Sequence, residues 1–246
     1  MIEVEGVGKR FKEVVAVDSV SFNAADGRIT GLLGENGAGK STTLRMIATI
    51  LRADRGTVRI DGVDVNRDAP AARARLGVLP HAHGLYARLT GRENIRYYGE
   101  LNGLSGAALE HRIESLAARL DIGDFIDRRT EGFSHGQKMK IALARALIHD
   151  PKNVVLDEPT NGLDVMATRA LRDVIRGLRA EGRCVLFSSH VMQEVAALCD
   201  DIRIIHNGRL VASGTPDALR EQTGEADLEE AFVKAIANAG SSTWAA

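Results

Sequence analysis

The nine residues 34–42 constrain this chain more than any other stretch of its sequence. They read Gly-Glu-Asn-Gly-Ala-Gly-Lys-Ser-Thr, which matches the G-x-x-x-x-G-K-S/T pattern of a phosphate-binding loop. Glycines let the backbone curl so that successive N–H groups point inward and form a nest for anionic oxygens. A helix that begins near Gly39 adds the positive end of its dipole to that nest. The stretch therefore predicts a loop that holds the phosphates of a nucleotide.

The side chains of this loop and the segments around it support the same prediction. Lys40 can reach the β- and γ-phosphates as a point charge, and the Ser41 hydroxyl can hold Mg²⁺. Residues 28–33 read as a buried strand, and residues 43–50 read as a helix with apolar positions three and four apart. The predicted nucleotide-binding residues of the loop are Gly34, Asn36, Gly37, Gly39, Lys40, Ser41 and Thr42.

Composition narrows the class of protein without assigning a function. The 246 residues are 44% apolar and 26% charged, as in ordinary globular proteins. A formal net charge of −1 gives no support for a nucleic-acid partner, and we expect none. Two cysteines form no disulfide framework, which favours a reducing compartment. No apolar stretch reaches the roughly 18 residues that cross a bilayer, so we expect another chain to supply any membrane part.

A second cluster of candidate residues follows two apolar strands. Residues 153–156 read as a buried parallel strand that ends on Asp157 and Glu158, and residues 184–187 read as another that leads to His190. The carboxyl ends of such strands are where an open α/β sheet presents its chemistry. A phosphate loop upstream favours a functional role for the two acids over solvated loop charges. For His190, the sequence pattern alone leaves a structural and a functional role equally open.

The remaining chain alternates strands, turns and helices. Near the N-terminus, residues 9–12 read as a basic turn between two strands, where Phe11 either stacks on a base or packs at a sheet edge. Residues 90–149 read as helices, and Ser134 is placed to cap one of them. Residues 219–236 read as a helix, and the chain from Gly240 onward is expected to be disordered. His81 and His83 have no cysteine or carboxylate nearby to complete a metal site, so we do not expect one.

The order of these motifs resembles the nucleotide-binding subunit of ABC transporters over nearly the whole chain. Residues 34–42 correspond to the Walker A motif, and 154–158 to Walker B with its catalytic glutamate. Residues 133–137 resemble the signature Leu-Ser-Gly-Gly-Gln, residues 162–164 match the D-loop, and His190 matches the switch histidine. Five motifs in the right order leave little room for chance.

This resemblance implies the fold and its divisions. The expected fold class is α/β, a P-loop NTPase core of the ABC ATPase kind with a small antiparallel β subdomain and an inserted α-helical subdomain. The ATP-binding domain would span residues 1–216, with the helical subdomain at about 85–150. Residues 217–246 would form a short C-terminal helix and a flexible tail.

The resemblance also implies how ATP and Mg²⁺ are held. Two subunits would form a head-to-tail homodimer around two ATP molecules, and the signature residues Ser134, Gly136 and Gln137 of one subunit would contact the ATP on the other. A helix N-terminus at this position suits a γ-phosphate. Phe11 matches the aromatic position that stacks on adenine, which is usually a tyrosine.

The catalytic roles follow from the same resemblance. Glu158 would orient or deprotonate the attacking water, and Asp157 would hold Mg²⁺ directly or through water. Lys40 and His190 would stabilise charge on the transferring phosphoryl group.

Two positions depart from the family pattern. His81 stands where the family carries a glutamine that touches Mg²⁺ or water and reports the nucleotide state to the membrane partner. A neutral histidine still accepts a hydrogen bond there, whereas a protonated one repels Mg²⁺, so we expect coupling to weaken below about pH 6.5. His135 replaces the first signature glycine, which removes backbone freedom and leaves Ser134, Gly136 and Gln137 in place.

Within the family, residues 84–90 and 227–232 are similar to the ABC-2 export group, and most of all to its sodium-extrusion ATPase subunits. The resemblance implies an ATPase that drives export through a separate integral membrane permease, lying in the cytoplasm on the inner face of the membrane. The alternatives are an exporter of a drug, lipid or polysaccharide, and a soluble ABC ATPase that acts on ribosomes or DNA. A single Walker A motif without long heptads or a cysteine cluster argues against the soluble class.

Overall fold

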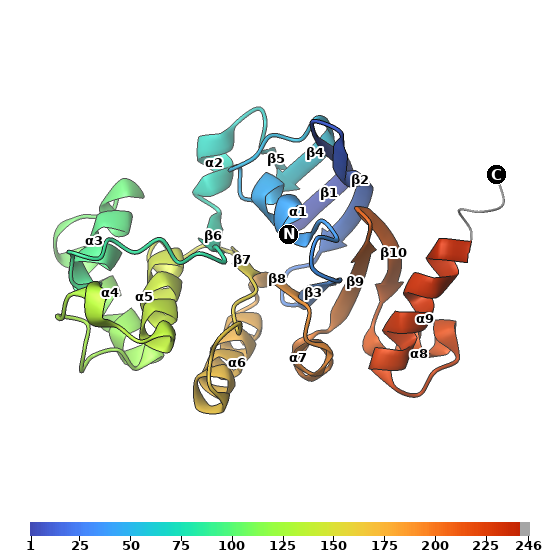
Figure 1. Ribbon diagram of the computed structural model, residues 1–246. Helices are drawn as coiled ribbons and strands as arrows, with labels where there is room; N and C mark the ends of the chain where they lie inside the picture. Colours follow the sequence, from blue (N-terminus) through green and yellow to red (C-terminus); the bar gives the residue numbers. More distant parts are fainter. Residues whose placement is uncertain (242–246) are drawn as a thin grey trace.

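The computed structural model describes residues 1–241, which form two β-sheets flanked by helices (Figure 1). The first sheet is antiparallel, with the strand order β2-β1-β4-β5. Its core side carries alternating apolar residues such as Ile2 and Val4, both almost fully buried. The strands are β1 (Ile2–Phe11), β2 (Val14–Ala24), β4 (Arg55–Ile60) and β5 (Val63–Asp64).

The second sheet has six strands in the order β10-β9-β3-β8-β7-β6. All neighbouring pairs are parallel except β9 and β10, which form an antiparallel hairpin at one edge. Strands β3, β7 and β8 are buried at every position, which explains why most of their residues are apolar. The strands are β3 (Ile29–Leu33), β6 (Leu76–Leu79), β7 (Asn153–Asp157), β8 (Cys184–Ser189), β9 (Asp201–His206) and β10 (Arg209–Gly214).

Helices α1 (Lys40–Ile47), α6 (Val165–Ala180) and α7 (Met192–Leu198) pack on the sheets. The first of them contacts β1, β2 and β4 of the antiparallel sheet and β7 of the parallel sheet, so it lies between the two. Helix α6 contacts β8, and α7 contacts β3 and β8. The short helix α2 (Ala69–Arg73) contacts β5 and β6.

A helical unit is inserted between β6 and β7 and lies at one end of the molecule (Figure 1). It comprises α3 (Gly91–Leu101), α4 (Gly106–Leu120) and α5 (His135–Leu147), which pack against one another around residues such as Ile95, Ile113 and Ile141. A 3₁₀ turn at Thr130–Gly132 precedes α5. The expected fold class is therefore confirmed, with its antiparallel β subdomain and its inserted α-helical subdomain.

Local capping chemistry sets where two of these helices begin. The Thr90 side chain accepts a hydrogen bond from the Glu93 N–H, and the Glu93 carboxylate accepts one from the Thr90 N–H. Ser134 and Gln137 form the same reciprocal pair at the start of α5. Both capping boxes satisfy backbone donors that have no partner within the helix, and the cap predicted at Ser134 is confirmed.

Three local predictions need correction. Most of the basic stretch 9–12 is strand, because β1 runs to Phe11. The turn itself begins at Lys12, which adopts the left-handed conformation. The single helix expected at 219–236 is two, α8 (Pro216–Thr223) and α9 (Leu228–Ser241), because Gly224 ends the first in the left-handed conformation that glycine adopts without strain. Residues 240 and 241 belong to α9, whereas the rest of the predicted disordered tail lies outside the described residues.

Candidate functional site

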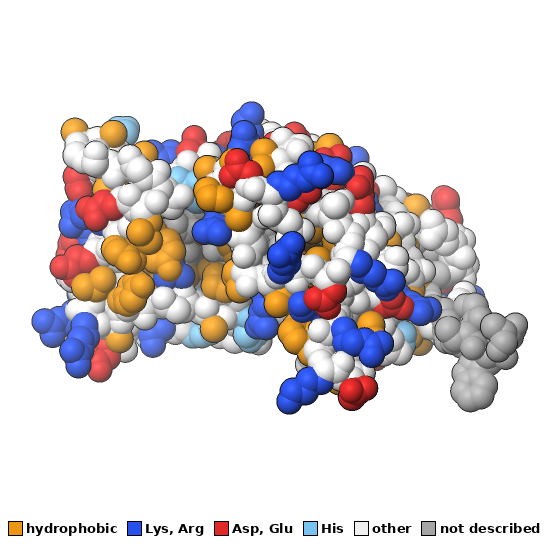
Figure 2. All heavy atoms as spheres, turned by 90° about the horizontal axis from the view of Figure 1, so that it is seen from above, with side chains coloured by type: hydrophobic (Ala, Val, Ile, Leu, Met, Phe, Trp, Pro, Cys, Tyr) orange, Lys and Arg blue, Asp and Glu red, His pale blue; other side chains and the backbone are white. Residues whose placement is uncertain are grey.

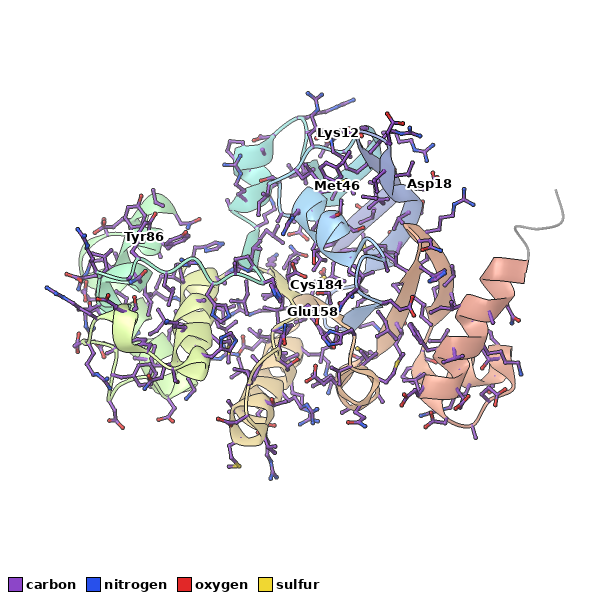
Figure 3. All side chains as sticks on the ribbon, viewed as in Figure 1. Lys12, Asp18, Met46, Tyr86, Glu158 and Cys184 are labelled. Carbon is purple, nitrogen blue, oxygen red and sulfur yellow. The ribbon has the colours of Figure 1, made fainter. Side chains whose placement is uncertain are left out.

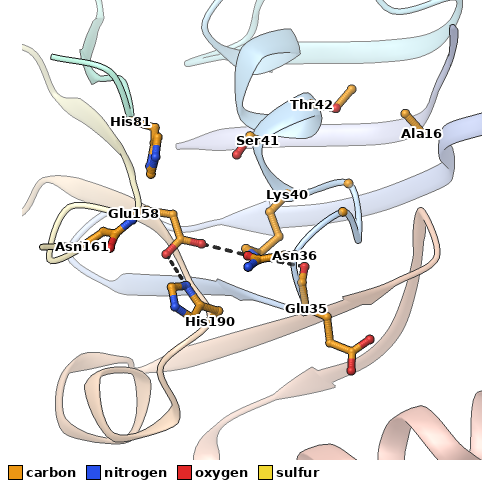
Figure 4. A pocket seen from close by; sticks show the side chains of 12 residues that line it. Ala16, Glu35, Asn36, Lys40, Ser41, Thr42, His81, Glu158, Asn161 and His190 are labelled. Carbon is orange, nitrogen blue, oxygen red and sulfur yellow. Dashed lines mark hydrogen bonds and ion pairs between the residues drawn. The ribbon is translucent and has the colours of Figure 1, made fainter.

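The loop between β3 and α1 forms a cavity of about 520 Å³ at the carboxyl ends of the parallel strands (Figure 4). Gly37 has a φ of +84° and Gly39 a φ of +108°, so the backbone curls in a way that other residues rarely allow. A Cβ on Gly39 would lie 2.6 Å from the Ala16 carbonyl oxygen, which also shows how closely β2 approaches the loop. Helix α1 begins at Lys40 and directs its positive end at the cavity, as the sequence predicts.

Lys40 is a buried cation whose partners are all acceptors. Its Nζ donates to the carbonyl oxygens of Gly34 at 2.7 Å and Glu35 at 3.2 Å, and it lies 3.3 Å from Glu158 Oε1. The Lys40 side chain is 5% exposed, so its charge acts at low local dielectric. A group of this kind attracts the oxygens of a phosphate strongly.

Ser41 lines the cavity and contacts Asp157, which ends β7. The Ser41 hydroxyl donates to Asp157 Oδ1 at 3.0 Å, and the Ser188 hydroxyl donates to the same oxygen at 2.8 Å. A carboxylate and a hydroxyl at this separation are the hard oxygen ligands that Mg²⁺ prefers. These residues therefore fit the predicted Mg²⁺ site, with Ser41 and Asp157 as its protein ligands.

Glu158 and His190 lie together on the opposite side of the cavity from the loop (Figure 4). His190 Nδ1 is 2.7 Å from Glu158 Oε2, and because a carboxylate only accepts, Nδ1 carries the proton. Glu158 holds a φ of +51°, an uncommon conformation for a residue other than glycine. Its N–H donates to the Ser188 hydroxyl at 3.0 Å, which helps to hold that conformation. Figure 3 shows Glu158 near the centre of the molecule.

The other residues predicted to bind nucleotide lie apart from this cavity within the chain. The signature residues 134, 136 and 137 sit at the start of α5, and none of them lines the cavity. Phe11 ends β1 with 47% of its surface exposed and does not line the cavity either. This exposure argues against the alternative, in which Phe11 packs at a sheet edge. The Lys9 ammonium lies 5.7 Å from the Phe11 ring centroid.

The two histidines that depart from the family pattern occupy different surroundings. His81 lines the cavity together with Glu158, Asn161 and His190. His135 begins α5 with an ordinary helical φ, so the position does not need a glycine. Its Nε2 donates to the Asn161 carbonyl oxygen at 2.9 Å and so joins the signature helix to the residue before the D-loop.

His83, in the loop after β6, lies beside His135 at the start of α5. The His83 and His135 ring centroids are 5.0 Å apart, and Arg145 donates to the carbonyl oxygens of His83 and Gly84. Burial, reinforced by the nearby charges of His135 and Arg145, lowers the pKa of His83 to about 4, so its ring is neutral at pH 7.

Sequence reasoning missed three residues of the site. Ala16 of β2 and Asn161, which directly precedes the D-loop, line the cavity, and Ser188 bridges Asp157 and the Glu158 N–H. For Ser188 a signal existed, since it sits at the end of a predicted parallel strand, where polar side chains are presented. Nothing in the sequence pattern around Ala16 indicates that β2 folds over the phosphate loop.

The geometry by itself defines a class of protein. A curled glycine loop, a buried lysine, a Mg²⁺-compatible serine–aspartate pair and a glutamate in the same cavity are the parts of a P-loop nucleotide triphosphatase. The inserted helical unit and the antiparallel sheet distinguish it from a plain P-loop fold. Within the described residues, no helix is both long and apolar enough to span a membrane.

Comparisons with known proteins agree with this class. A family model described as "ABC transporter" matches residues 17–161. The ABC transporter ATP-binding protein NatA of Bacillus subtilis is 42% identical over 96% of this chain and 98% of its own length. The Nod factor export ATP-binding protein I of Paraburkholderia xenovorans is 39% identical over 94% of this chain and 76% of its own. A solved ATP-binding subunit of an ABC transporter is 31% identical, with a TM-score of 0.89 over 96% of this chain and 99% of that one.

The chain therefore belongs to the ABC transporter ATP-binding subunits. It is an ATPase of that family, and its relatives include subunits of export systems. The family binds ATP, generally with Mg²⁺.

Proposed function

We propose that this chain is the motor subunit of an exporter whose membrane-spanning part is a separate permease, and that the exported species is the sodium ion. The observation that carries the motor role is the meeting of Lys40, Glu158 and His190 in one cavity. Sodium as cargo rests on the resemblance to sodium-extrusion subunits, together with the near full-length similarity to NatA.

In the proposed reaction the chain's own residues orient and stabilise. Lys40 and the N–H groups of the loop neutralise the charge that develops on the γ-phosphoryl group. Glu158 orients the attacking water and accepts its proton, while His190 holds Glu158 through the 2.7 Å hydrogen bond and faces the γ-phosphate. Ser41 and Asp157 would hold Mg²⁺, which screens the phosphate charge when bound.

The separation of the signature from the cavity supports a head-to-tail homodimer. Ser134, Gly136 and Gln137 lie at the start of a 13-residue helix whose N-terminus suits an anion, yet they do not line the cavity of their own chain. A second subunit would bring the same three residues to the γ-phosphate. Phe11 would stack on the adenine, since its ring is exposed at the end of β1.

An apolar surface on the helical unit supports a permease partner. Figure 2 shows apolar side chains gathered over this end of the molecule. The exposed large side chains of the unit include Tyr86, Tyr97 and Leu101, and the rings of Tyr86 and Tyr97 meet edge to face at 5.5 Å. Exposed apolar patches of this kind mark sites of association with another protein. The subunit would then lie on the cytoplasmic face of the membrane.

The proposed divisions of the chain follow from the same architecture. Residues 1–216 would form the ATP-binding domain, with the helical subdomain at about 85–150. Residues 217–246 would form an appended C-terminal segment, which here includes most of α8 and all of α9.

The alternatives concern the cargo and the site of action. The similarity to the Nod factor export protein supports one alternative, an exporter of a drug, lipid or polysaccharide. A soluble ABC ATPase acting on ribosomes or DNA would use the same ATP site, but the formal net charge of −1 gives no support for a nucleic-acid partner.

The deciding experiment is isolation of the tagged chain from gently solubilised native membranes. We expect one polytopic membrane protein to co-purify in near-equal amount. Sodium uptake into inverted vesicles that contain the pair, driven by ATP, then tests the cargo. Recovery of ribosomes, nucleic acid or only soluble proteins would contradict the transporter role, and ATP-dependent transport without sodium movement would contradict the cargo alone.

A further inference from the structure

A buried carboxylate with no role in the site described above lies in the first turn of α7. Glu194 is 6% exposed, and its Oε2 accepts a hydrogen bond from the Thr160 hydroxyl and another, at 3.3 Å, from the Ser189 hydroxyl. Both donors are buried as well, Thr160 at 9% and Ser189 at 1% exposed. Within residues 1–241 no lysine, arginine or histidine forms an ion pair with Glu194.

Burial of the Glu194 carboxylate destabilises the folded protein unless other interactions compensate for it. A carboxylate removed from water loses several kcal/mol of hydration, and hydroxyl donors restore only part of that loss. A leucine of similar volume at this position would avoid the cost. Stability alone therefore does not account for an acid at position 194.

The two hydroxyls belong to segments that carry the candidate catalytic pair. Thr160 follows Glu158 by two residues and precedes the D-loop, and Ser189 directly precedes His190 at the end of β8. The Ser189 oxygen also accepts from the Val191 N–H at 2.9 Å, so the backbone on both sides of His190 is held. Glu194 thus joins the chain after Glu158 to the chain around His190.

Glu158 depends on such external support. Its φ of +51° is sparsely populated for a residue with a side chain, and such conformations persist only where the surroundings hold them. Ser188 holds one side of the residue through the Glu158 N–H. On the C-terminal side of Glu158, the Thr160 hydroxyl donates a hydrogen bond to Glu194, and this bond connects the chain after Glu158 to α7.

We propose that Glu194 is a positioning residue for ATP hydrolysis: through Thr160 and Ser189 it holds Glu158 and His190 in the relative arrangement that the reaction needs. The proposal rests on the roles proposed above for these two residues. Misplacement of a catalytic group by about 1 Å can cost up to about a hundredfold in rate, so two hydrogen bonds at this point have a large effect.

The test compares substitutions that keep volume and remove hydrogen bonding, in the purified full-length chain with saturating ATP and Mg²⁺. Thr160→Val removes the hydroxyl, and we expect kcat to fall about tenfold with KM for ATP within about twofold of the parent. Thr160→Ser restores the hydroxyl and should recover most of kcat. Glu194→Gln keeps an acceptor oxygen and should stay within about threefold of the parent, whereas Glu194→Leu should fall at least as far as Thr160→Val.

A matched control separates positioning from loss of stability. Thr223 of α8 is 8% exposed and its hydroxyl donates to the Leu219 carbonyl at 2.8 Å, far along the chain from the site. Thr223→Val should lower the melting temperature as much as Thr160→Val does and leave kcat unchanged. If Thr160→Val also keeps the parent kcat, or if KM rises in step with the loss of kcat, the positioning role is overturned.

Glu158→Gln in the same assay separates this inference from the proposed function. An active Glu158→Gln variant would show that Glu158 is not the base, and it would overturn the proposed role of Glu158 together with this inference. An inactive Glu158→Gln variant beside a fully active Thr160→Val variant would overturn only the role of Glu194.

Discussion

Glu158→Gln is expected to slow ATP hydrolysis by about 10²- to 10⁴-fold, which is the usual contribution of a positioned general base. Glutamine has nearly the same shape and keeps an oxygen that can accept from His190, so the cavity should retain its form. It has no basic carboxylate to take a proton from water. The Lys40 ammonium, 3.3 Å from Glu158 Oε1, keeps its two carbonyl acceptors and remains available for phosphate.

Because binding is preserved while turnover is lost, the same variant should accumulate an ATP-bound dimer. The measurements are the steady-state ATPase rate and the apparent mass by size-exclusion chromatography with and without ATP. Glu221→Gln, on the exposed side of α8, makes the same charge change away from the cavity and should match the parent. Hydrolysis at the parent rate would show that another group acts as the base.

Lys40→Ala is expected to weaken ATP binding by at least about thirtyfold. Removing one partner from a buried charged contact typically costs about 2 kcal/mol or more, which corresponds to that factor. The Lys40 side chain is 5% exposed, and among the described residues 1–241 no other lysine or arginine lines the cavity, so no neighbour there can take its place. The Glu158 carboxylate would also lose its lysine partner, which adds repulsion toward the phosphates.

Titration of the purified chain with a fluorescent ATP analogue measures the dissociation constant directly. Lys152→Ala removes an exposed lysine in the turn before β7 and serves as the control for net charge. An unchanged dissociation constant in Lys40→Ala would contradict the role of Lys40 in ATP binding. If kcat falls while that affinity stays unchanged, Lys40 acts in the transition state alone.

Much of the site was predictable because its parts are local. The curl of residues 34–42 depends on glycines at fixed spacing, and the caps at Thr90 and Ser134 depend on a partner three residues away. The acids Asp157 and Glu158 could be found because an apolar strand ends at them, and parallel strands present such ends along one edge.

The failures of prediction have an equally physical origin. The separation of α8 from α9 depends on the left-handed conformation of Gly224, which a smooth helical pattern in the flanking residues conceals. The turn predicted at 9–12 failed because pairing with β2 extends β1 through three residues of a polar, basic stretch. Pairing with a neighbouring strand can therefore extend a strand through residues whose composition predicts a turn.

The sequence by itself determined the phosphate loop, the order of the motifs and the α/β class, since these depend on backbone conformation and on periodicity within short segments. Only the tertiary structure decided which distant residues meet: Ala16 over the loop, His135 on the Asn161 carbonyl, and Glu194 between Thr160 and Ser189. Such contacts depend on how separate elements pack against one another, and no short stretch of the sequence predicts them.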